Sequence, residues 1–426
     1  MLVFLAGACS SGEVPELGAK DEPTTVPASE VVVAEDVVAT TTTQPVVDEP
    51  SELFDFGVTN SSIRVGLSLD LQGSRSAVDA VILDAHLAYF DIVNAAGGIA
   101  GRDVDIVALN HASSLDAHVD NLAQLAENSE QGVVLVGSAG SGEFADAGLP
   151  ILQREGLAAV LQGAAQTVAD GSSGVLEIGR TTCVDTVDGV SGLLTNVDLE
   201  APTLAIIARD GAYGQSSREA AEWVAQQLGS SVVMSTDDVE ELDDVVERLV
   251  EASPDLVWVA VSPRELGLLA GAVQNLEFDW RWSGTPQSYD AGLLEVAAAE
   301  LLDERYTHVA SIAPYGLSDS STRDEMIAEA FPDVRYRDAD SLTLGWQQAE
   351  AVHEMLLLAA EAGDLTRASL TSIVSERARS VELTSRFFEI DLEVAAIDVV
   401  LAAEGSTGLI EIDRLSTPVE GASPCE

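Results

Sequence analysis

The first apolar stretches of the chain change from strand-like to helix-like spacing and back. Residues 63–69 form an apolar run typical of a strand. Downstream, apolar side chains recur at helical spacing and form one face: Val81, Ala85, Ala88, Tyr89, Ile92 and Val93. Gly97-Gly98 can supply the left-handed residue that ends a helix, and alternation at Val104, Ile106 and Ala108 then marks a half-buried strand. This order predicts a βαβ unit and therefore a parallel sheet.

Apolar runs and amphipathic stretches keep alternating along the rest of the chain. We expect strands at 133–137, 158–161, 203–208 and 255–261, helices at 117–128, 216–228 and 344–358, and alternating strands at 387–401. A segment from about 62 to 415 is too long for one simple core and suits two domains. After the first residues, no run is long and apolar enough to span a bilayer.

The strongly negative charge of the chain excludes one class of function, nucleic-acid binding. Its 426 residues include 72 acidic and 20 basic residues, which gives a net charge of -52, and Lys20 is the single lysine. Nucleic-acid binding needs basic patches, so we exclude that class. Such a surface suits a well-solvated, repelling protein in salty surroundings, and an acidic face shaped for a cationic partner is the alternative.

The N-terminal residues resemble a bacterial lipoprotein signal. In residues 1–9 an apolar stretch leads to the small residues Ala6-Gly7-Ala8 and then to Cys9. No Lys or Arg precedes the stretch, and it is shorter than a normal signal, which a start codon assigned too late would explain. A chance cysteine is the alternative. We expect Cys9 to carry a diacylglycerol anchor, because two or more acyl chains hold a protein stably on a membrane.

Residues 10–61 have the composition of a tether. They are rich in Glu, Asp, Thr, Val and Pro, include Thr40–Thr43, and lack helical periodicity. Such a segment cannot bury enough apolar surface to order itself, and its like charges keep it extended. We therefore expect a disordered acidic tether that holds a folded domain away from a membrane.

The residues around the first βαβ unit carry a family resemblance. Residues 63–69 and the run Val93–Arg102, with Gly97-Gly98-Ile99 at its centre, closely resemble the opening of branched-chain-amino-acid-type periplasmic binding proteins. These are the type I, two-lobed solute-binding proteins of ABC importers, and the resemblance spans about 62–414. An arbitrary α/β enzyme with a glycine helix stop is the alternative, but ten matching residues in this context favour the family.

The resemblance implies an α/β fold with two Rossmann-like lobes, whose parallel sheets are joined by three crossover strands. We expect the crossings near 181–185, 307–315 and 381. Lobe 1 would then comprise 62–184 and 310–380, lobe 2 would comprise 185–309 and 381–415, and 416–426 would form a C-terminal tail.

The family grips its ligand at turns that follow two strands of the first lobe. Ser141 matches a serine-rich turn, and we expect it to contact ligand with Gly142 as a backbone donor at an exposed helix N-terminus. A loop that merely turns is the alternative. The second turn follows Gln162, where the family often has a hydroxyl but this chain has Ala164 and Ala165. Backbone N–H groups near Ala164, with the Gln162 side chain, would bind there.

The second lobe would contribute Tyr213 and Gln287. Tyr213 matches a cleft-facing tyrosine that stacks on ligand, and packing against the following helix is the alternative. Relatives that hold an α-ammonium group have an acid in the loop where this chain has Thr285 and Gln287. Relatives also often have an aromatic residue where this chain has Val261-Ser262.

These departures indicate a ligand other than an ordinary branched-chain amino acid. A buried ammonium group without an acceptor is costly, whereas neutral groups suit an amide, a hydroxylated compound or a carboxylate without an α-ammonium group. An alignment shifted by a few residues would bring Asp290 or Glu265 into the cleft and restore the ammonium grip. At its present place, we expect Asp290 to begin the next helix.

Three cysteines and five histidines complete the candidate chemistry. If Cys9 is lipidated, Cys183 and Cys425 remain as an even pair that could form a disulfide, and two unpaired thiols are the alternative. The histidines are His86, His111, His118, His308 and His353, and none has the spacing of a metal site. We expect His111 to be a solvated loop residue. There is no nucleophile elbow and no phosphate-binding loop, so we expect no enzyme, metal or cofactor.

The sequence therefore predicts an extracytoplasmic solute-binding lipoprotein on the outer face of the cell membrane. It would be a monomer that captures a small polar molecule between its lobes, closes by hinge motion and delivers the molecule to an ABC transporter permease. The alternative is a ligand-sensing lipoprotein with the same clamp and no transport role. Neighbouring permease genes or kinase genes would distinguish the two, and an extracytoplasmic hydrolase would need nucleophile–base pairs that are absent from the sequence.

Lipidation of Cys9 can be tested by fractionation. In a strain that expresses the gene with its complete signal, we expect Cys9→Ser to move the protein from the membrane fraction to the soluble one, because the acyl chains can no longer be attached. Ser10→Ala is the matched control and should stay with the membrane. Membrane association unchanged in Cys9→Ser would contradict the lipoprotein reading.

Overall fold

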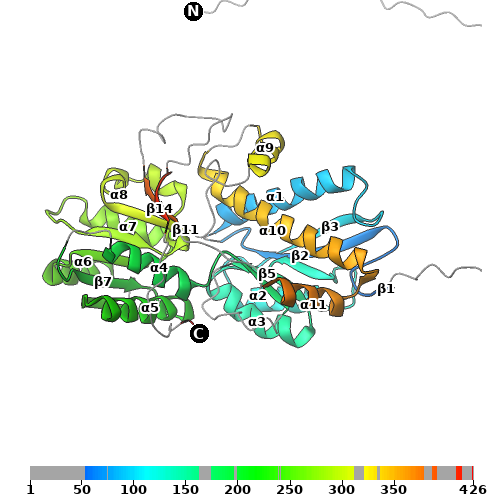
Figure 1. The fold of residues 1–426 in the computed structure, drawn as a ribbon, viewed down its shortest axis with the longest axis horizontal. Coiled ribbons are helices and arrows are strands. Elements are labelled where there is room, and N and C mark those ends of the chain that lie inside the picture. Colours follow the sequence, from blue (N-terminus) through cyan, green and yellow to red (C-terminus); the bar gives the residue numbers. More distant parts are fainter. Residues whose placement is uncertain are drawn as a thin grey trace, which may run out of the picture. The chain divides into compact units, whose positions relative to one another are not determined.

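The structure is a computed structural model of the chain, drawn in Figure 1. The residues that it describes are 53–73, 75–162, 174–195, 199–237, 239, 241–310, 321–332, 336–378, 386–390, 409–414 and 425. Cys9, Ala164 and most of the predicted tether lie outside them. Residues 50–426 form one unit, and among the described residues no helix has the length and apolar character needed to cross a bilayer.

A five-stranded parallel sheet organises the first lobe, in the spatial order β3-β2-β4-β5-β6. The strands are β2 (Ser62–Leu69), β3 (Asp103–Asn110), β4 (Leu135–Ser138), β5 (Ala158–Gln162) and β6 (Val175–Ile178). The helices are α1 (Ser76–Ala95), α2 (Leu115–Ala126), α3 (Glu143–Glu155), α9 (Ser321–Ala330), α10 (Tyr336–Glu361) and α11 (Arg367–Ala378). The predicted βαβ unit is confirmed, since α1 connects β2 to β3 and the two strands pair in parallel.

A seven-stranded sheet organises the second lobe, in the order β14-β13-β11-β10-β9-β7-β8. The strands are β7 (Thr203–Ala208), β8 (Ser231–Thr236), β9 (Leu256–Ala260), β10 (Arg281–Gly284), β11 (Tyr306–Ala310), β13 (Arg386–Ile390) and β14 (Leu409–Arg414). The helices are α4 (Thr182–Thr195), α5 (Ala212–Leu228), α6 (Leu242–Ala252), α7 (Pro263–Val273) and α8 (Ala299–Arg305), with the 3-10 turns η1 (Pro286–Ser288) and η2 (Ala291–Glu295). Because β13 pairs antiparallel with both β11 and β14, the prediction of a parallel sheet is wrong at this edge.

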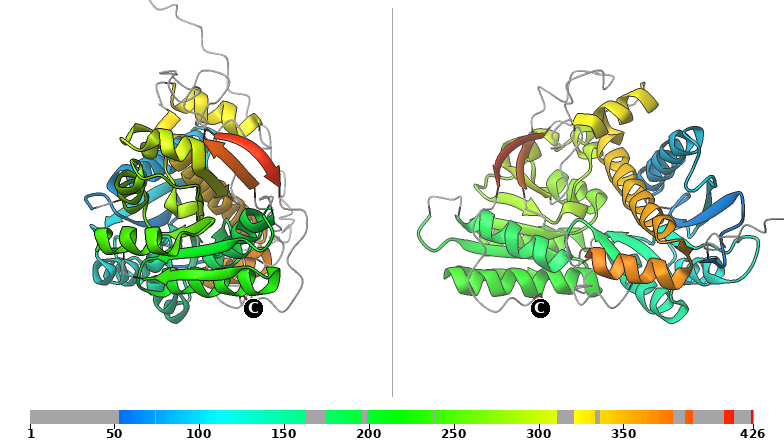
Figure 2. Two further views of the ribbon diagram at one scale, coloured as in Figure 1. Left: turned by 90° about the vertical axis from the view of Figure 1, so that its left-hand side faces the viewer. Right: turned by 45° about the vertical axis from the view of Figure 1, so that its right-hand side comes forward.

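Helices cover both faces of each sheet (Figure 2). In the first lobe, α1 and α10 pack on one face and α2 and α3 on the other. In the second lobe, α4 and α5 lie opposite α6, α7 and α8. Along β7, Leu204 and Ile206 face the first of these helix layers while Ala205 and Ile207 face the second. Sheets buried on both faces in this way explain the nearly continuous apolar strands of the sequence.

The chain passes between the two sheets after β6, after β11 and after α11. The first link, residues 179–181, has no regular secondary structure, so the described part of this crossing is a short connection rather than a strand. The other two links fall at 311–320 and 379–385, outside the described residues. The lobe boundaries expected from the sequence therefore stay a prediction.

The glycine stop after α1 is confirmed. The helix ends at Ala95, both following glycines have positive φ, and the N–H of Gly98 donates to the carbonyl of Val93 at 3.0 Å. A Cβ at Gly98 would lie 2.0 Å from the carbonyl oxygen of Arg102, so only glycine fits this turn. The turn folds Ile99 back into the core, where it is fully buried.

Close packing of α1 against α10 forms the main core of the first lobe. The rings of Tyr89 and Trp346 meet edge to face, with centroids 5.2 Å apart. Gly345 allows the helices to approach, because a Cβ there would lie 2.9 Å from the Cα of Ile82. The predicted amphipathic helix 344–358 is confirmed as part of α10.

Arg367 joins three parts of the first lobe. Its guanidinium donates to the carbonyls of Ala126 and Val133, at 2.7 and 2.6 Å, and its side chain lies over the Phe56 ring. Its backbone N–H donates to the carboxylate of Asp55, next to the pairing of β1 (Leu53–Phe54) with β12 (Asp364–Leu365). With 8% of its surface exposed, Arg367 satisfies carbonyls at and after the end of α2 and fastens Asp55 and Phe56 to this lobe. The prediction of a disordered tether over 10–61 is therefore wrong for residues 53–61, which are ordered against the first lobe.

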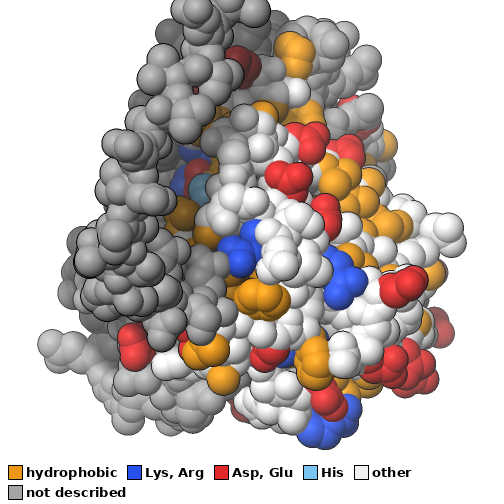
Figure 3. Space-filling model, turned by 90° about the vertical axis from the view of Figure 1, so that its right-hand side faces the viewer, with side chains coloured by type: hydrophobic (Ala, Val, Ile, Leu, Met, Phe, Trp, Pro, Cys, Tyr) orange, Lys and Arg blue, Asp and Glu red, His pale blue; other side chains and the backbone are white. Residues whose placement is uncertain are grey.

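The outer end of the first lobe carries the exposed side chains of Leu53, Phe54 and Phe56. Figure 3 shows that side of the molecule, where apolar side chains lie among acidic and basic ones. The acids are thus interspersed with apolar surface on this face.

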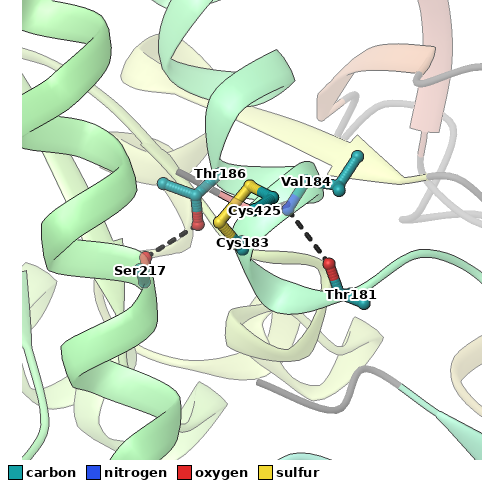
Figure 4. Close-up of a disulfide and its surroundings, with 6 residues drawn as sticks. All are labelled: Thr181, Cys183, Val184, Thr186, Ser217 and Cys425. Carbon is teal, nitrogen blue, oxygen red and sulfur yellow. Dashed lines mark hydrogen bonds between the residues drawn. A yellow bond between two sulfur atoms is a disulfide. The ribbon is translucent and has the colours of Figure 1, made fainter. Parts of the chain in front are cut away.

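The structure joins Cys183, in the first turn of α4, to Cys425 by a disulfide (Figure 4). Both side chains are buried beside Ala220 of α5. Two hydrogen bonds flank the bridge, from Val184 N–H to Thr181 Oγ1 at 3.3 Å and between the hydroxyls of Thr186 and Ser217 at 2.8 Å. The bridge therefore anchors the C-terminal end of the chain two residues after the first link between the lobes.

Removing this disulfide should lower the free energy of unfolding by about 2–5 kcal/mol, because a cross-link between distant residues restricts the unfolded chain. We expect Cys183→Ser together with Cys425→Ser to unfold at lower denaturant concentration than the parent protein, and Cys9→Ser to behave like the parent. Two free thiols in the denatured, unreduced Cys9→Ser protein would contradict the assignment.

Candidate functional site

The turns after β4 and β5 lie together at the carboxyl edge of the first sheet. Ser141 pairs with Gln162 in a parallel bridge. The N–H of Gly142 donates to the carbonyl of Gln162 at 3.1 Å, and the N–H of Gln162 donates to Gly140 at 3.3 Å. The structure thus brings together three of the residues expected to bind ligand, and Ala164 lies outside the described residues.

Gly142 and Ser141 differ in what they can offer a solute. The N–H of Gly142 donates within the protein, so in this arrangement it is not directed at a solute as expected. The hydroxyl of Ser141 has no hydrogen-bond partner among the described residues, while its carbonyl accepts from the N–H of Phe144 at 3.2 Å. Ser141 Oγ is therefore the hydrogen-bonding group that this turn leaves available.

Tyr213 lies in the first turn of α5 and meets the other lobe. A Cβ built on Gly142 would be 3.5 Å from Cδ2 of the Tyr213 ring, so a gap about one methyl group wide separates the N-cap of α3 from the ring. The phenol is hydrogen-bonded to Thr285 Oγ1, which in turn meets Ser288 Oγ at 2.9 Å. Burial raises the pKa of Tyr213 to about 12, so the phenol stays protonated at neutral pH.

Tyr213 packs within its own lobe and also has a ring edge toward the other lobe, so its surroundings agree in part with each of the two hypotheses drawn from the sequence. The ring packs in its own lobe against Ala208 and Ala260 and leaves 6% of the residue exposed. Its hydroxyl is occupied within that lobe. The ring edge toward Gly142 is the part of Tyr213 that faces the opposite lobe.

Gln287 follows β10 and has a buried acceptor without a partner. Its Oε1 finds no hydrogen-bond donor among the described residues. The neighbouring hydroxyl of Ser288 is occupied, since it meets Thr285 and accepts from the N–H of Val261 at 3.2 Å. Of the polar side chains in this turn, Gln287 is thus the one that remains open to a donor.

Both acids that could restore an ammonium grip are used as helix caps. Asp290 accepts from the N–H of Gly292 at 2.8 Å, and the prediction that it begins the next helical segment is confirmed by η2. Burial raises the pKa of Asp290, and the charge of Arg75 partly offsets this rise. Glu265 closes a capping box with Ser262, accepting from its N–H at 2.7 Å.

Sequence reasoning was wrong about His111. The residue follows β3, but it is only 3% exposed, and its ring stacks on Phe144 of α3 with centroids 4.5 Å apart. Burial lowers the pKa of His111, so the imidazole is neutral at pH 7. A histidine at the end of a predicted strand was the available signal, but nothing local revealed that Phe144 would cover it.

Asp70 is a second residue that the sequence analysis missed. It follows β2 directly and accepts from the N–H groups of Gln72 and Arg75 and from the hydroxyl of Ser113. Burial alone would raise the pKa of Asp70, but these hydrogen bonds outweigh it and lower the pKa. The carboxylate thereby ties the turn after β2 to the turn after β3, and its place after a predicted strand was the signal that could have found it.

The described residues hold no group of three or more His, Cys, Asp or Glu side chains suited to a metal ion. The candidate residues Ser141, Gln162, Tyr213 and Gln287 are neutral and lie at the carboxyl ends of strands from two lobes, the edge at which ligands bind in open α/β sheets.

Comparison with known proteins relates this arrangement to a family. A family model described as periplasmic binding protein matches residues 62–389. Comparison with curated proteins found no match.

Solved structures share the fold at low identity. The substrate-binding protein of a fatty acid ABC transporter from Thermomonospora curvata is 20% identical, with a TM-score of 0.74 over 87% of this chain and 97% of that chain. The leucine-binding protein of Thermotoga maritima is 12% identical, with a TM-score of 0.66 over 83% and 98% of the two chains. A solute-binding protein from R. palustris in complex with 4-hydroxybenzoate is 13% identical, with a TM-score of 0.67 over 84% and 98%. Because the family model covers most of the described two-lobed fold, the chain belongs to the type I periplasmic binding proteins, the solute-binding proteins of ABC transporters.

Proposed function

We propose that this protein captures a small polar solute between its lobes and delivers it to the permease of an ABC transporter. The observation that carries the proposal is the closeness of the Tyr213 ring to Gly142, beside the ion pair of Glu143 with Arg209, because it places the carboxyl edges of the two sheets opposite each other at the candidate turns. A solute enclosed there would be gripped from both sides, and its binding would favour the closed arrangement of the lobes.

The solved structures of similar fold do not share one solute. The similar structures carry names that refer to a fatty acid, to leucine and to 4-hydroxybenzoate. One fold therefore serves chemically different solutes, and specificity depends on the side chains at the strand ends.

Those side chains favour a solute without an α-ammonium group. Asp290 and Glu265 are occupied as caps, so recruiting either for a cation would cost its helix a hydrogen bond. Gln287 Oε1 is a neutral buried acceptor, and Ser141 Oγ can donate or accept. We infer a neutral amide, a hydroxylated compound or a carboxylate that lacks an α-ammonium group.

We further propose that a lipid on Cys9 anchors the protein to the outer face of the cell membrane and that it acts as a monomer. Ala6-Gly7-Ala8 before Cys9 supports the lipid, and the acidic segment before Leu53 would give the folded part reach from the membrane. A long acidic tether suits a receptor that must both collect solute and meet a permease in the same membrane.

The ligand can be recovered from the purified protein. We expect mass spectrometry of material released by denaturation to find one small polar molecule in near-stoichiometric amount. Loss of uptake of that molecule when the gene is deleted would support transport. Normal uptake after deletion, with the molecule still bound by the protein, would favour the sensing alternative.

Removing the Tyr213 ring should weaken binding of the recovered molecule by on the order of a few kcal/mol, as for a truncated contact anchor. Tyr213→Phe is the matched control, since it keeps the ring and loses only a hydroxyl that is paired with Thr285. Calorimetry that gives wild-type affinity for a folded Tyr213→Ala variant would refute the placement of the site.

Branched-chain amino acids should bind poorly. The ammonium group of leucine, isoleucine or valine would face Gln287 instead of a carboxylate, and a buried cation without a charged partner is costly. We expect calorimetry to detect no submicromolar binding of any of the three. Gln287→Glu should improve their binding relative to wild type, and submicromolar binding by the unmodified protein would show that the acid is supplied by another residue.

A further inference from the structure

Glu143 and Arg209 form an ion pair between the lobes. Glu143 is the first residue of α3 in the first lobe, and Arg209 directly follows β7 in the second. Their Oε1 and Nη2 atoms are 3.9 Å apart. Gly142 and the Tyr213 ring, which face each other across a gap about one methyl group wide, belong to the same two turns, so the pair stands at the edge of the candidate solute site.

The carboxylate of Glu143 also lies in front of α5. The nearest atom to a Cβ built on Gly211 would be Glu143 Oε2, at 3.9 Å. Gly211 is the N-cap of α5 and offers no side-chain cap, and the first turn of that helix contains no acid. Glu143 thus brings from the other lobe the negative charge that a helix N-terminus favours.

In a second interaction between the lobes, the first lobe supplies the arginine and the second lobe supplies the acid. Arg75 belongs to the first lobe, beside Asp79 at 3.6 Å, and its charge acts on Asp290 of the second lobe. Each lobe therefore contributes an arginine that faces an acid of the other lobe. This pattern is notable in a chain with 72 acids and 20 bases, since two acidic bodies otherwise repel as they approach.

We propose that Glu143 and Arg209 act as a charge clasp that stabilises the closed arrangement of the lobes. They are positioning residues, which raise the affinity for solute by favouring closure without contacting the solute. The inference rests on the proposed function in one respect, that closure serves solute capture. The clasp itself is a property of the protein without solute.

Interlobe distances test the clasp directly. In the full chain carrying Cys9→Ser, nitroxide labels at Leu87→Cys on α1 and Leu268→Cys on α7 would report the distance between lobes by double electron–electron resonance, since both leucines are exposed. We expect Arg209→Gln and Glu143→Gln each to raise the ratio of open to closed molecules roughly two- to fivefold, the scale of a partly exposed pair.

The double variant separates a clasp from two independent effects. If the groups act on each other, Arg209→Gln should change the distances much less in the Glu143→Gln background than in the parent. Salt near 1 M should open the parent but not the double variant, because screening then acts within about 3 Å. Arg154→Gln is the matched control, as Arg154 pairs with its neighbour Glu155 inside one lobe.

The outcomes also separate the clasp from the proposed function. Unchanged distances in both single variants, or fully additive effects in the double variant, would overturn the clasp even if the protein binds and delivers a solute. Because the distances are measured without solute, an absence of transport would leave the result intact. Equal opening by Arg154→Gln would show a general charge effect and would likewise overturn the proposal.

Discussion

Self-repulsion is the constraint on which the rest of this structure depends, since 72 acids face 20 bases in one chain. Two buried arginines donate hydrogen bonds to backbone carbonyls. Arg367 donates to the carbonyls of Ala126 and Val133, and Arg102 donates to the carbonyl of Thr59 at 2.8 Å. A guanidinium has five donors in a planar fork, so it can satisfy several carbonyls at once without needing a carboxylate partner. These two arginines fasten the segment before β2 to the first lobe.

The same pairing of polar groups shapes the facing edges of the lobes. In the first lobe the N–H of Gly142 donates to the carbonyl of Gln162, and the N–H of Gln162 donates to the carbonyl of Gly140. In the second lobe the hydroxyls of Tyr213, Thr285 and Ser288 form a connected set. Turns held by internal hydrogen bonds lose little entropy when a solute arrives, so binding energy is not spent on ordering them. Ser141 Oγ and Gln287 Oε1 find no partner among the described residues, and under the proposed function they are the groups that would select the solute.

Much of the fold could be predicted because its signals are local. The glycine stop after α1, the run 203–208 and the amphipathic stretch in α10 each depend on residues close together in sequence. What failed depends on long-range contact: the antiparallel edge of the second sheet needs β13 to meet β11, and the burial of His111 needs Phe144. In the candidate site, the ends of the predicted strands were enough to locate the turns. The hydrogen bonds that occupy the Gly142 N–H and the Tyr213 hydroxyl could not be predicted, because their partners Gln162 and Thr285 are distant in the sequence.

A neutral site within a strongly negative protein has consequences for capture. The long-range field attracts cations and repels anions, but it exerts no net pull on a neutral molecule, so encounter with such a solute is not steered by charge. Affinity must then come from contacts made once the solute is enclosed and from whatever holds two acidic lobes together. Under the proposed clasp, Arg209 meets the second need by pairing with Glu143 of the opposite lobe. The two proposals thus assign recognition and closure to different residues. A change of solute specificity would then arise at Gln287 or Ser141 and leave the pair of Glu143 with Arg209 in place.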